Sequence, residues 1–492
     1  MKKIAIIGAG IGGLSSAIIL ADKDFEIDIY EKNSGPGGKA SSISMSGFRF
    51  DTGPSFITMP FVIENLFQSA GEHLREYIDI EPLDILCKYF FNDGTIINAY
   101  ADRDRFADEI ETKTTEKREN VFNFLNYCKK IYDLTSDVFL FNDLFSAKNY
   151  LNLKSLKTLL NIRRIDSSRT MNAAIRSYFT DEKVIQIFSR YATYNGSNPF
   201  KAPATLNIIS DVEYNKGGYY LKGGMYELTK ALHKIAVRKK IKFRFNSKVS
   251  RILIDNKKVK GISINDIEKD YGIIISNSDT AYTYRYLLND FETKNAKRYS
   301  KLEPSSSAVV FYWGMKIKSD LLNVHNILFS GDYKKEFEIM FNDKSICDDP
   351  TIYIYISSKF SKDDAPEGYE NWFVMVNAPY NTNQNWDEIL TRLKTNILNK
   401  IKSFLKTDIS NLIVFEKILT PADIECETLS NKGSIYGISS NTKMAAFMRQ
   451  RNKSKEYDGL YFCGGSAHPG GGIPLVILSG KITAELIIRN EL

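Results

Sequence analysis

The chain has 492 residues, too many for one hydrophobic core, so we expect two or more domains. Hydrophobic residues make up 43% and charged residues 25%, as in a soluble globular protein, and the net charge of +7 is too diffuse to predict nucleic-acid binding. Five Cys without CxxC or metal-ligand spacing, with only four His, argue against a metal site and indicate free thiols in a reducing cytoplasm.

The N-terminal residues read as a strand–helix–strand unit. Lys3–Ile7 is a β-branched run typical of a strand buried on both faces, Leu14–Leu20 continue as a helix, and Phe25–Tyr30 form the second strand. The same stretch has the outline of a signal peptide. The glycine cluster in its middle and the second strand after it favour the βαβ unit instead.

Glycines in this unit predict a dinucleotide site, because they form the GxGxxG pattern. The first permits a tight turn, the second lets the backbone approach a pyrophosphate, and the third lets helix and strand pack closely. Glu31 ends the second strand and is placed to accept hydrogen bonds from an adenosine ribose, which argues against a 2′-phosphate ligand. We predict cofactor contacts from Gly8, Gly10, Gly12, Gly13, Glu31 and Lys32.

Two more glycine turns follow, at Gly37-Gly38-Lys39 and in the stretch FDTGPS, residues 50–55. A nicotinamide site has no need of them, whereas an extended flavin nucleotide does, so we expect FAD. The arrangement resembles the flavoproteins with two dinucleotide-binding domains, which include amine oxidases, protoporphyrinogen oxidase and carotenoid desaturases. The resemblance implies that Lys39 stands where Arg is common and that residues 53–55 lie near the flavin ring. It adds Gly38, Lys39, Gly53, Pro54 and Ser55 to the predicted cofactor contacts.

Near the C-terminus, residues 461–487 run from a strand into a glycine cluster and then a helix pattern. The resemblance implies that this strand and helix return to the first domain, with backbone passing close to the flavin. The helix would open at Ile473-Pro474, because Pro is favoured at the first helical position. A flexible hinge is the alternative, but the apolar run IPLVIL favours a buried helix. The predicted contacts here are Gly464, Gly465, Gly472, Ile473 and Pro474.

The middle of the chain alternates between domains. Residues 217–264 read as turn, helix, strand, strand, hairpin turn and strand, with the hairpin turn at Asp255-Asn256. By resemblance this segment returns to the FAD-binding domain and brings Val249 to the adenine. Residues 271–279 are another buried strand with a polar end.

The predicted fold class is α/β, with a Rossmann-like FAD-binding domain beside a mixed sheet-plus-helix substrate domain. Residues 80–212 look mainly helical, and residues 305–380 alternate as strands. We predict the FAD-binding domain at 1–79, 213–290 and 455–492, a helical region for substrate and membrane contact at 80–212, and the substrate-domain sheet at 291–454.

The whole chain resembles the bacterial carotenoid desaturases of the phytoene-desaturase family. The motifs that carry the resemblance are RYATYNGSNPFKAPATLN (190–207), YLKGGMYEL (220–228), DDPTIYIYIS (348–357), DAPEGYENWFVMV (364–376) and HPGGGIP (468–474). It implies removal of two hydrogens from an acyclic C40-type carotenoid by hydride transfer to flavin, since side chains cannot accept hydride. Typical phytoene desaturases end in THPGAGIPG, and the pattern AHPGGGIPL found here favours an end-group enzyme similar to the 1-hydroxycarotenoid 3,4-desaturases.

The substrate hydroxyl and the released proton both need partners. An unpaired buried hydroxyl costs about 1–3 kcal/mol, and Tyr194, Asn195 or Ser197 are candidates to bind it. The proton acceptor is flavin, water or a side chain. His468, the one His inside a cofactor motif, is either a proton-handling group at the flavin edge or a structural residue. Arg169, turned inward toward the substrate, is a weaker catalytic candidate.

A membrane surface is the expected meeting place with so hydrophobic a substrate. Residues 149–171 carry basic residues interleaved with Leu and Ile, which is typical of amphipathic helices on anionic lipid and equally of a solvated helix face. The basic residues are Lys154, Lys157, Arg163, Arg164 and Arg169. The preceding residues 138–145 add Phe139, Phe141 and Phe145, which would dip into the interface or pack in the core. We therefore predict a cytoplasmic protein held peripherally on the cytoplasmic membrane.

Other functions remain open at this point. The enzyme alternatives are a general phytoene or diapophytoene desaturase, a carotenoid oxygenase or isomerase on the same scaffold, and a flavin amine oxidase. The non-enzyme alternative is a prenyl-lipid-binding escort without flavin, which predicts loss of the C-terminal glycines that this chain retains. The electron acceptor, oxygen or a quinone, is also left open.

Overall fold

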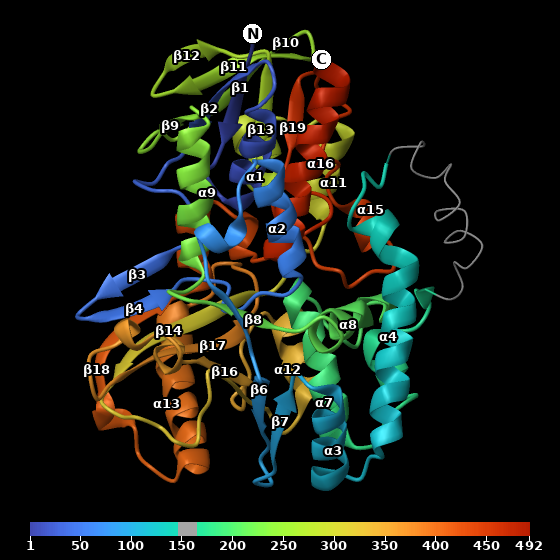
Figure 1. The fold of residues 1–492 in the computed structure, drawn as a ribbon, viewed down its shortest axis with the longest axis vertical. Helices are drawn as coiled ribbons and strands as arrows, with labels where there is room; N and C mark the ends of the chain where they lie inside the picture. Colours follow the sequence, from blue (N-terminus) through green and yellow to red (C-terminus); the bar gives the residue numbers. More distant parts are fainter. Residues whose placement is uncertain (146–164) are drawn as a thin grey trace.

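The computed structural model describes residues 1–145 and 165–492. A parallel sheet lies at the end of the molecule that carries both termini, and a larger sheet lies at the other end (Figure 1). Helices from the middle of the chain pack beside the larger sheet (Figure 1). The α/β class and the two-part architecture predicted from the sequence are confirmed.

Five parallel strands build the first sheet, in the order β19-β13-β1-β2-β9. Their bounds are Lys2–Ile7 for β1, Phe25–Tyr30 for β2, Lys242–Arg244 for β9, Ile273–Ser276 for β13 and Leu460–Phe462 for β19. The apolar β-branched residues of β1 are buried because helices cover both faces of a parallel sheet. Strands from 1–79, 213–290 and 455–492 thus meet in one sheet, although the domain boundaries themselves stay a prediction.

Two helices from opposite ends of the chain pack together on this sheet. They are α1 (Ile11–Leu20) and α16 (Ile473–Glu491), and Ser16 Oγ donates a hydrogen bond to Gly480 O at 3.0 Å. The predicted return of the C-terminal strand and helix to the first domain is therefore confirmed. Pro474 is the second residue of α16 rather than the first. Other helices of this half are α2 (Pro60–Ser69), α9 (Tyr226–Arg238), α10 (Thr280–Tyr282) and α11 (Lys294–Lys301). The strands β3 (Ser42–Met45), β4 (Phe48–Asp51) and β8 (Tyr219–Leu221) lie toward the larger sheet, where Phe48, Phe50 and Tyr220 pack into its core.

A small antiparallel sheet confirms the predicted hairpin. It consists of β10 (Arg251–Asp255), β11 (Lys258–Ile264) and β12 (Ile267–Asp270). Asn256 and Lys257 form the turn with φ of 48° and 62°. Two left-handed residues in a row give the backbone twist that a two-residue hairpin needs.

The second sheet has seven strands in the order β18-β14-β17-β16-β15-β6-β7. Their bounds are Ile85–Phe90 (β6), Ile96–Tyr100 (β7), Ser307–Met315 (β14), His325–Leu328 (β15), Ile352–Tyr355 (β16), Glu370–Ala378 (β17) and Ile413–Leu419 (β18). Along β14, Val309, Phe311 and Trp313 pack toward α13 (Trp386–Leu405), and the alternate residues pack into the other core. Both faces of the sheet are therefore buried at β14.

The segment predicted to be mainly helical begins with strands. Residues 80–100 form β5 (Ile80–Pro82), β6 and β7, so the helical interpretation is wrong there. The strand β6 joins the second sheet by pairing with β15, more than 200 residues away, and such a partner leaves no local sequence signal. The helices that follow are α3 (Arg103–Lys113), α4 (Arg118–Phe139), α6 (Met171–Ile175), α7 (Glu182–Ser189) and α8 (Ile208–Tyr214). The remaining helices are α12 (Tyr333–Glu338), α14 (Pro421–Thr428) and α15 (Ala445–Met448).

Candidate functional site

A cavity of about 910 Å³ lies between the two sheets. The glycine turns and the C-terminal motif form one side, and residues of β14, β15, β16 and β17 form the other. The structure brings nearly all predicted cofactor residues to this wall: Gly8, Gly10, Gly12, Glu31, Lys32, Gly38, Lys39, Gly53, Pro54, Ser55, Val249, Gly464, Gly465, Gly472, Ile473 and Pro474. Gly13 lies outside it, where a Cβ atom would come within 2.5 Å of Gly8 O, in keeping with its predicted packing role.

The first turn of α1 faces the cavity. Gly10, Ile11 and Gly12 line the wall, no side chain caps the helix, and its first turn holds no acidic residue. A Cβ atom on Gly12 would lie 2.9 Å from Gly464 N, so only glycine allows the two turns to approach this closely. Unpaired amides at a helix N-terminus attract anions, so this position suits a pyrophosphate.

Glu31 is held rigidly at the end of β2. Its carboxylate accepts hydrogen bonds from the backbone N–H groups of Ala9 and Asn33, both at 2.9 Å. The residue is 6% exposed and lines the cavity. A carboxylate has about four acceptor positions, so two remain for ribose hydroxyls.

Lys39 places a cation in the same wall. Its Nζ donates to the backbone oxygens of Ser434 and Ile435, both at 2.9 Å. Burial of the ammonium group lowers the pKa of Lys39 to about 8, and the nearby Asp279 carboxylate opposes this shift. Asp279 also lines the cavity and accepts from Ala281 N at 2.9 Å, which caps α10.

Asn277 connects the glycine turns and was missed by sequence reasoning. It follows β13, lines the cavity, and donates from Nδ2 to Gly8 O at 3.2 Å. Cβ atoms added to Gly10 or Gly464 would meet its side chain within 3 Å. The polar end of the 271–279 strand was the only signal, and nothing local connected it with the glycines of the two chain ends.

The two catalytic candidates, His468 and Arg169, do not line the cavity. His468 is 2% exposed, and its Nε2 bonds to Asn142 O at 2.9 Å. Burial lowers the pKa of His468, so a neutral imidazole ties the C-terminal motif to the segment after α4. Arg169 forms an ion pair with Asp166 at 2.6 Å, and its side chain is 42% exposed. These contacts support the structural alternative for His468 and leave Arg169 away from the cavity.

The far wall of the cavity is aromatic, and of the substrate-contact candidates named from the sequence only Tyr194 lines it. Arg190, His325 and Tyr353 line it together with apolar residues. Tyr194 lines it too, but its hydroxyl already donates to Glu213 Oε2 at 2.9 Å. The apolar members of this wall are Leu86, Ala308, Val310, Ile327, Phe373 and Met375.

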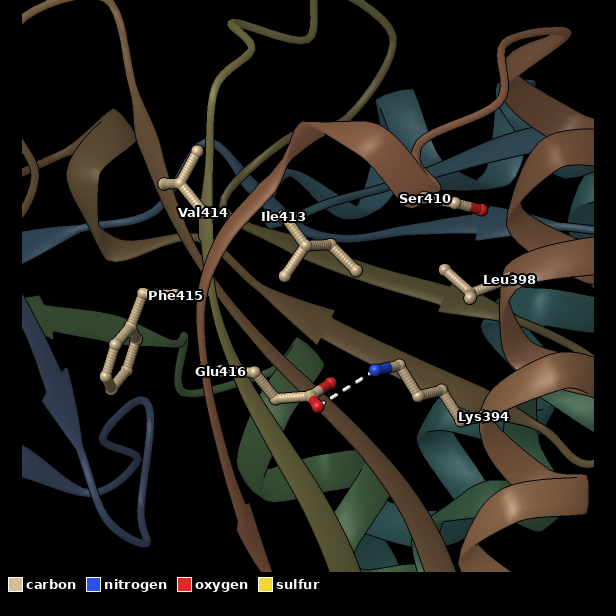
Figure 2. Close-up of a pocket in the computed structure, with 7 residues that line it drawn as sticks. All are labelled: Lys394, Leu398, Ser410, Ile413, Val414, Phe415 and Glu416. Carbon is tan, nitrogen blue, oxygen red and sulfur yellow. Dashed lines mark hydrogen bonds and ion pairs between the residues drawn. The ribbon is translucent and has the colours of Figure 1, made fainter.

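A second hollow of about 460 Å³ lies between α13 and β18 (Figure 2). Lys394 and Glu416 face each other across it with 2.9 Å between Nζ and Oε1 (Figure 2). None of the predicted cofactor residues lines this hollow. The chemistry of the chain is therefore concentrated in the larger cavity.

Comparison with known proteins identifies the family. Residues 11–276 match the family described as flavin containing amine oxidoreductase. The chain is 42% identical to 1-hydroxycarotenoid 3,4-desaturase of Flavobacterium sp. strain P99-3, over 99% of both chains. This chain belongs to the FAD-dependent carotenoid desaturase family. It is also 34% identical to 4,4'-diaponeurosporene oxygenase of Staphylococcus haemolyticus, over 100% of this chain and 98% of the relative.

The fold is shared with solved oxidoreductase structures. An oxidoreductase from Methanosarcina mazei superposes with a TM-score of 0.65 at 16% identity, covering 98% of this chain and 100% of that one. The predicted family, cofactor and enzyme class are confirmed: this member of the carotenoid desaturase family is an FAD-dependent oxidoreductase. Its uncapped helix N-terminus, Glu31 and the glycine turns fit FAD, and bound FAD supplies the hydride acceptor that side chains lack.

Proposed function

We propose that this enzyme forms the C3–C4 double bond of a 1-hydroxylated acyclic carotenoid. The observation that carries the proposal is the 42% identity, over 99% of both chains, with a protein of that named activity. The cavity supports it, because one wall fits FAD and the opposite wall is apolar and aromatic. An apolar wall matches a polyene and leaves little of it in contact with water.

The proposed reaction removes a hydride from one carbon and a proton from its neighbour. The residues of this chain hold the substrate and exclude water, with Val310, Ile327 and Phe373 on the wall that faces the glycine turns. The cation spread over the polyene needs no nucleophile. We propose that residues 53–55 lie near the flavin ring, as the resemblance implies, and that this loop holds the substrate end against it.

The test compares substrates directly. Purified enzyme with FAD is given a 1-hydroxylated acyclic carotenoid or phytoene, without oxygen and with an added quinone. We expect the hydroxylated substrate to lose two hydrogens by mass and to react faster. Faster conversion of phytoene would favour a general desaturase, and a product that gains oxygen only in air would favour an oxygenase like the staphylococcal relative.

We also propose that the enzyme works on the surface of the cytoplasmic membrane. In residues 1–145 and 165–492 we find no helix long and apolar enough to span a bilayer. The predicted basic residues Lys154, Lys157, Arg163 and Arg164 lie outside the described residues, and the exposed Arg169 lies at their border. Phe145 packs against Arg451, whose guanidinium carbon is 4.0 Å from the ring centroid, so it is not free to enter lipid.

Exposed apolar side chains support a membrane-facing surface at the end of α4. Phe61 packs on Phe141 with ring centroids 6.2 Å apart, and Phe139 packs on Phe447 at 5.6 Å. Phe61, Phe447 and Met444 are 37%, 40% and 54% exposed. We name these five residues the aromatic patch. Its residues come from α2, from the end of α4 and the residues that follow, and from α15 and the residue before it. Clustered exposed apolar surface marks an interaction site.

Charge reversal tests the basic segment. Changing Lys154, Lys157, Arg163 and Arg164 to Glu should cost several kcal/mol of binding to anionic liposomes, since each basic residue near such a surface contributes about 1 kcal/mol. High salt should reproduce only part of the loss, because apolar contacts are not screened. Co-sedimentation is measured beside flavin absorbance, which should not change. A four-Glu variant that sediments like the parent would place the membrane contact elsewhere.

A further inference from the structure

One buried polar atom in the cavity wall has no partner. His325, the first residue of β15, is 3% exposed and lines the cavity. Its Nδ1 bonds to the hydroxyl of Tyr353 at 2.8 Å, but its Nε2 bonds to nothing in the described residues. No other described cavity-lining residue has a buried side-chain nitrogen or oxygen without a partner. Because buried polar groups are almost always paired, this atom indicates a missing ligand group.

His325 lies close to the loop expected at the flavin. Tyr353 OH, its Nδ1 partner, is also 2.6 Å from Ser55 Oγ. The ring of Phe56, the next residue in the chain, lies 5.5 Å from the imidazole, centroid to centroid. A chain of two hydrogen bonds thus connects His325 with residues 53–55.

The chemistry of the proposed substrate places its hydroxyl in the same region. In a 1-hydroxycarotenoid that reacts at C3–C4, two carbon–carbon bonds of about 1.5 Å each separate the carbinol carbon from the nearer reacting carbon. The partner of the hydroxyl must therefore lie beside the flavin and not at the far end of a tunnel.

The residues that the sequence analysis named as partners for the substrate hydroxyl already form hydrogen bonds within the protein. Tyr194 OH accepts from Arg190 at 3.0 Å in addition to donating to Glu213. Asn195 donates to Ser440 Oγ at 2.8 Å and accepts from Arg449 at 2.9 Å. Ser197 Oγ donates to the backbone oxygen of Asn195 and accepts from Ser440 N. Each would have to give up a contact to bind substrate, whereas His325 would gain one.

We propose that His325 Nε2 hydrogen-bonds to the C1 hydroxyl of the carotenoid and that this contact selects a hydroxylated end group. The inference rests on the proposed 3,4-desaturation and adds the residue that recognises its substrate. Burial and the nearby Arg190 charge lower the pKa of His325 to about 3. The imidazole therefore stays neutral, which suits a hydrogen-bond partner and not the acceptor of the released proton.

Two substitutions separate the two ring nitrogens. The amide of His325→Gln reaches the position of Nε2, whereas the shorter His325→Asn reaches only that of Nδ1 and keeps the Tyr353 contact. Each holoenzyme is given a 1-hydroxylated acyclic carotenoid and the same carotenoid without the hydroxyl. We expect Asn to lower kcat/KM for the hydroxylated substrate about 10- to 100-fold and to leave the other substrate nearly unchanged. Gln should keep most of the preference.

The outcomes distinguish this inference from the proposed function. If the parent enzyme does not convert the hydroxylated carotenoid, the proposed 3,4-desaturation and the role of His325 are both overturned. If it does and His325→Asn keeps the full preference with normal flavin content, only the role of His325 falls. Should the Asn variant fail to retain FAD, Tyr353→Phe decides instead, because it removes the Nδ1 partner that orients the ring. We expect a partial loss of preference there, and an unchanged preference would overturn the assignment.

Discussion

Arg190, which lines the cavity, forms a buried ion pair with Glu213, with 3.0 Å between Arg190 Nη2 and Glu213 Oε1. Their side chains are 6% and 1% exposed. The guanidinium also donates to the hydroxyls of Tyr89, Tyr191 and Tyr194 at 2.7 to 3.2 Å. A polyene in the cavity therefore meets aromatic rings and a charge that is fully paired.

Breaking this pair should destabilise the protein. Arg190→Met leaves Glu213 as an uncompensated buried charge, and we expect the free energy of unfolding to fall by about 3–5 kcal/mol. Arg190→Met with Glu213→Leu removes both charges and should recover part of that loss. Urea unfolding of the holoenzymes provides the measurement. Additive effects of the two substitutions would show that the ion pair contributes no coupling.

Blocking the turn before α1 should abolish flavin binding. A Cβ atom on Gly10 would lie 2.9 Å from Asn277 Nδ2 and would occupy the cavity wall, so Gly10→Val should give colourless protein. Gly272→Val is the matched control, because nothing lies within 4 Å of a Cβ atom there. Flavin absorbance per mole of purified protein measures the effect. Full occupancy in the Gly10 variant would rule out this turn as the pyrophosphate site.

FAD affinity should fall as pH rises above about 8. The folded protein without FAD holds Lys39 with a pKa of about 8, lowered by burial from its ordinary 10.5, so the cation that attracts anionic FAD is lost in that range. The dissociation constant should then rise by at most about tenfold per pH unit. The sign for stability without FAD is opposite: between pH 8 and 10.5 the unfolded chain binds more protons, so this group makes stability rise with pH.

Two substitutions isolate the contribution of Lys39. Lys39→Arg should bind FAD as the parent does at pH 7 and keep that affinity to pH 9.5, because guanidinium stays charged. Lys39→Met should bind more weakly at pH 7 and show no dependence between pH 7 and 9.5. FAD fluorescence titrations on the apoprotein measure all three. A parent curve as flat as that of Lys39→Arg would contradict the prediction.

The aromatic patch should contribute to liposome binding independently of salt. Met444→Asn with Phe447→Asn removes two exposed apolar side chains and should lower co-sedimentation with liposomes by a salt-insensitive amount, about 2–4 kcal/mol for the pair. Ile267→Asn with Val414→Asn is the control, since these residues are 63% and 52% exposed on β12 and β18. Equal effects of the two pairs would mean that the patch has no special role.

Local sequence patterns predicted several strands and turns of this fold. Lys3–Ile7 and Phe25–Tyr30 have the β-branched runs of buried parallel strands, and the structure has β1 and β2 there within one residue. The glycine turns were equally predictable from the sequence, because close approach of the backbone to a pyrophosphate requires glycine whatever the rest of the chain is. The strands β6 and β7 were not predicted: they pair with each other, but β6 joins the second sheet only by pairing with β15, more than 200 residues away.

The substrate wall was harder to predict than the cofactor wall. Glu31 and Lys39 belong to short motifs with a fixed spacing, so sequence alone drew attention to them. His325 stands by itself in the sequence, and its importance depends on Tyr353 holding one ring nitrogen while the other is left unpaired. Similarly, His468 stood inside a motif and attracted attention, but its ring faces Asn142.

The position of β19 at the edge of the parallel sheet, beside β13, means that the flavin site is completed only at the end of synthesis. The ribosome makes β1 and β2 first and reaches β19 and α16 only after more than 400 further residues. At roughly 5–20 residues per second, the nascent glycine turns wait on the order of tens of seconds without their C-terminal neighbours. A ribosome stalled before residue 460 would therefore carry a chain that lacks β19, α16 and the C-terminal glycines of the flavin site.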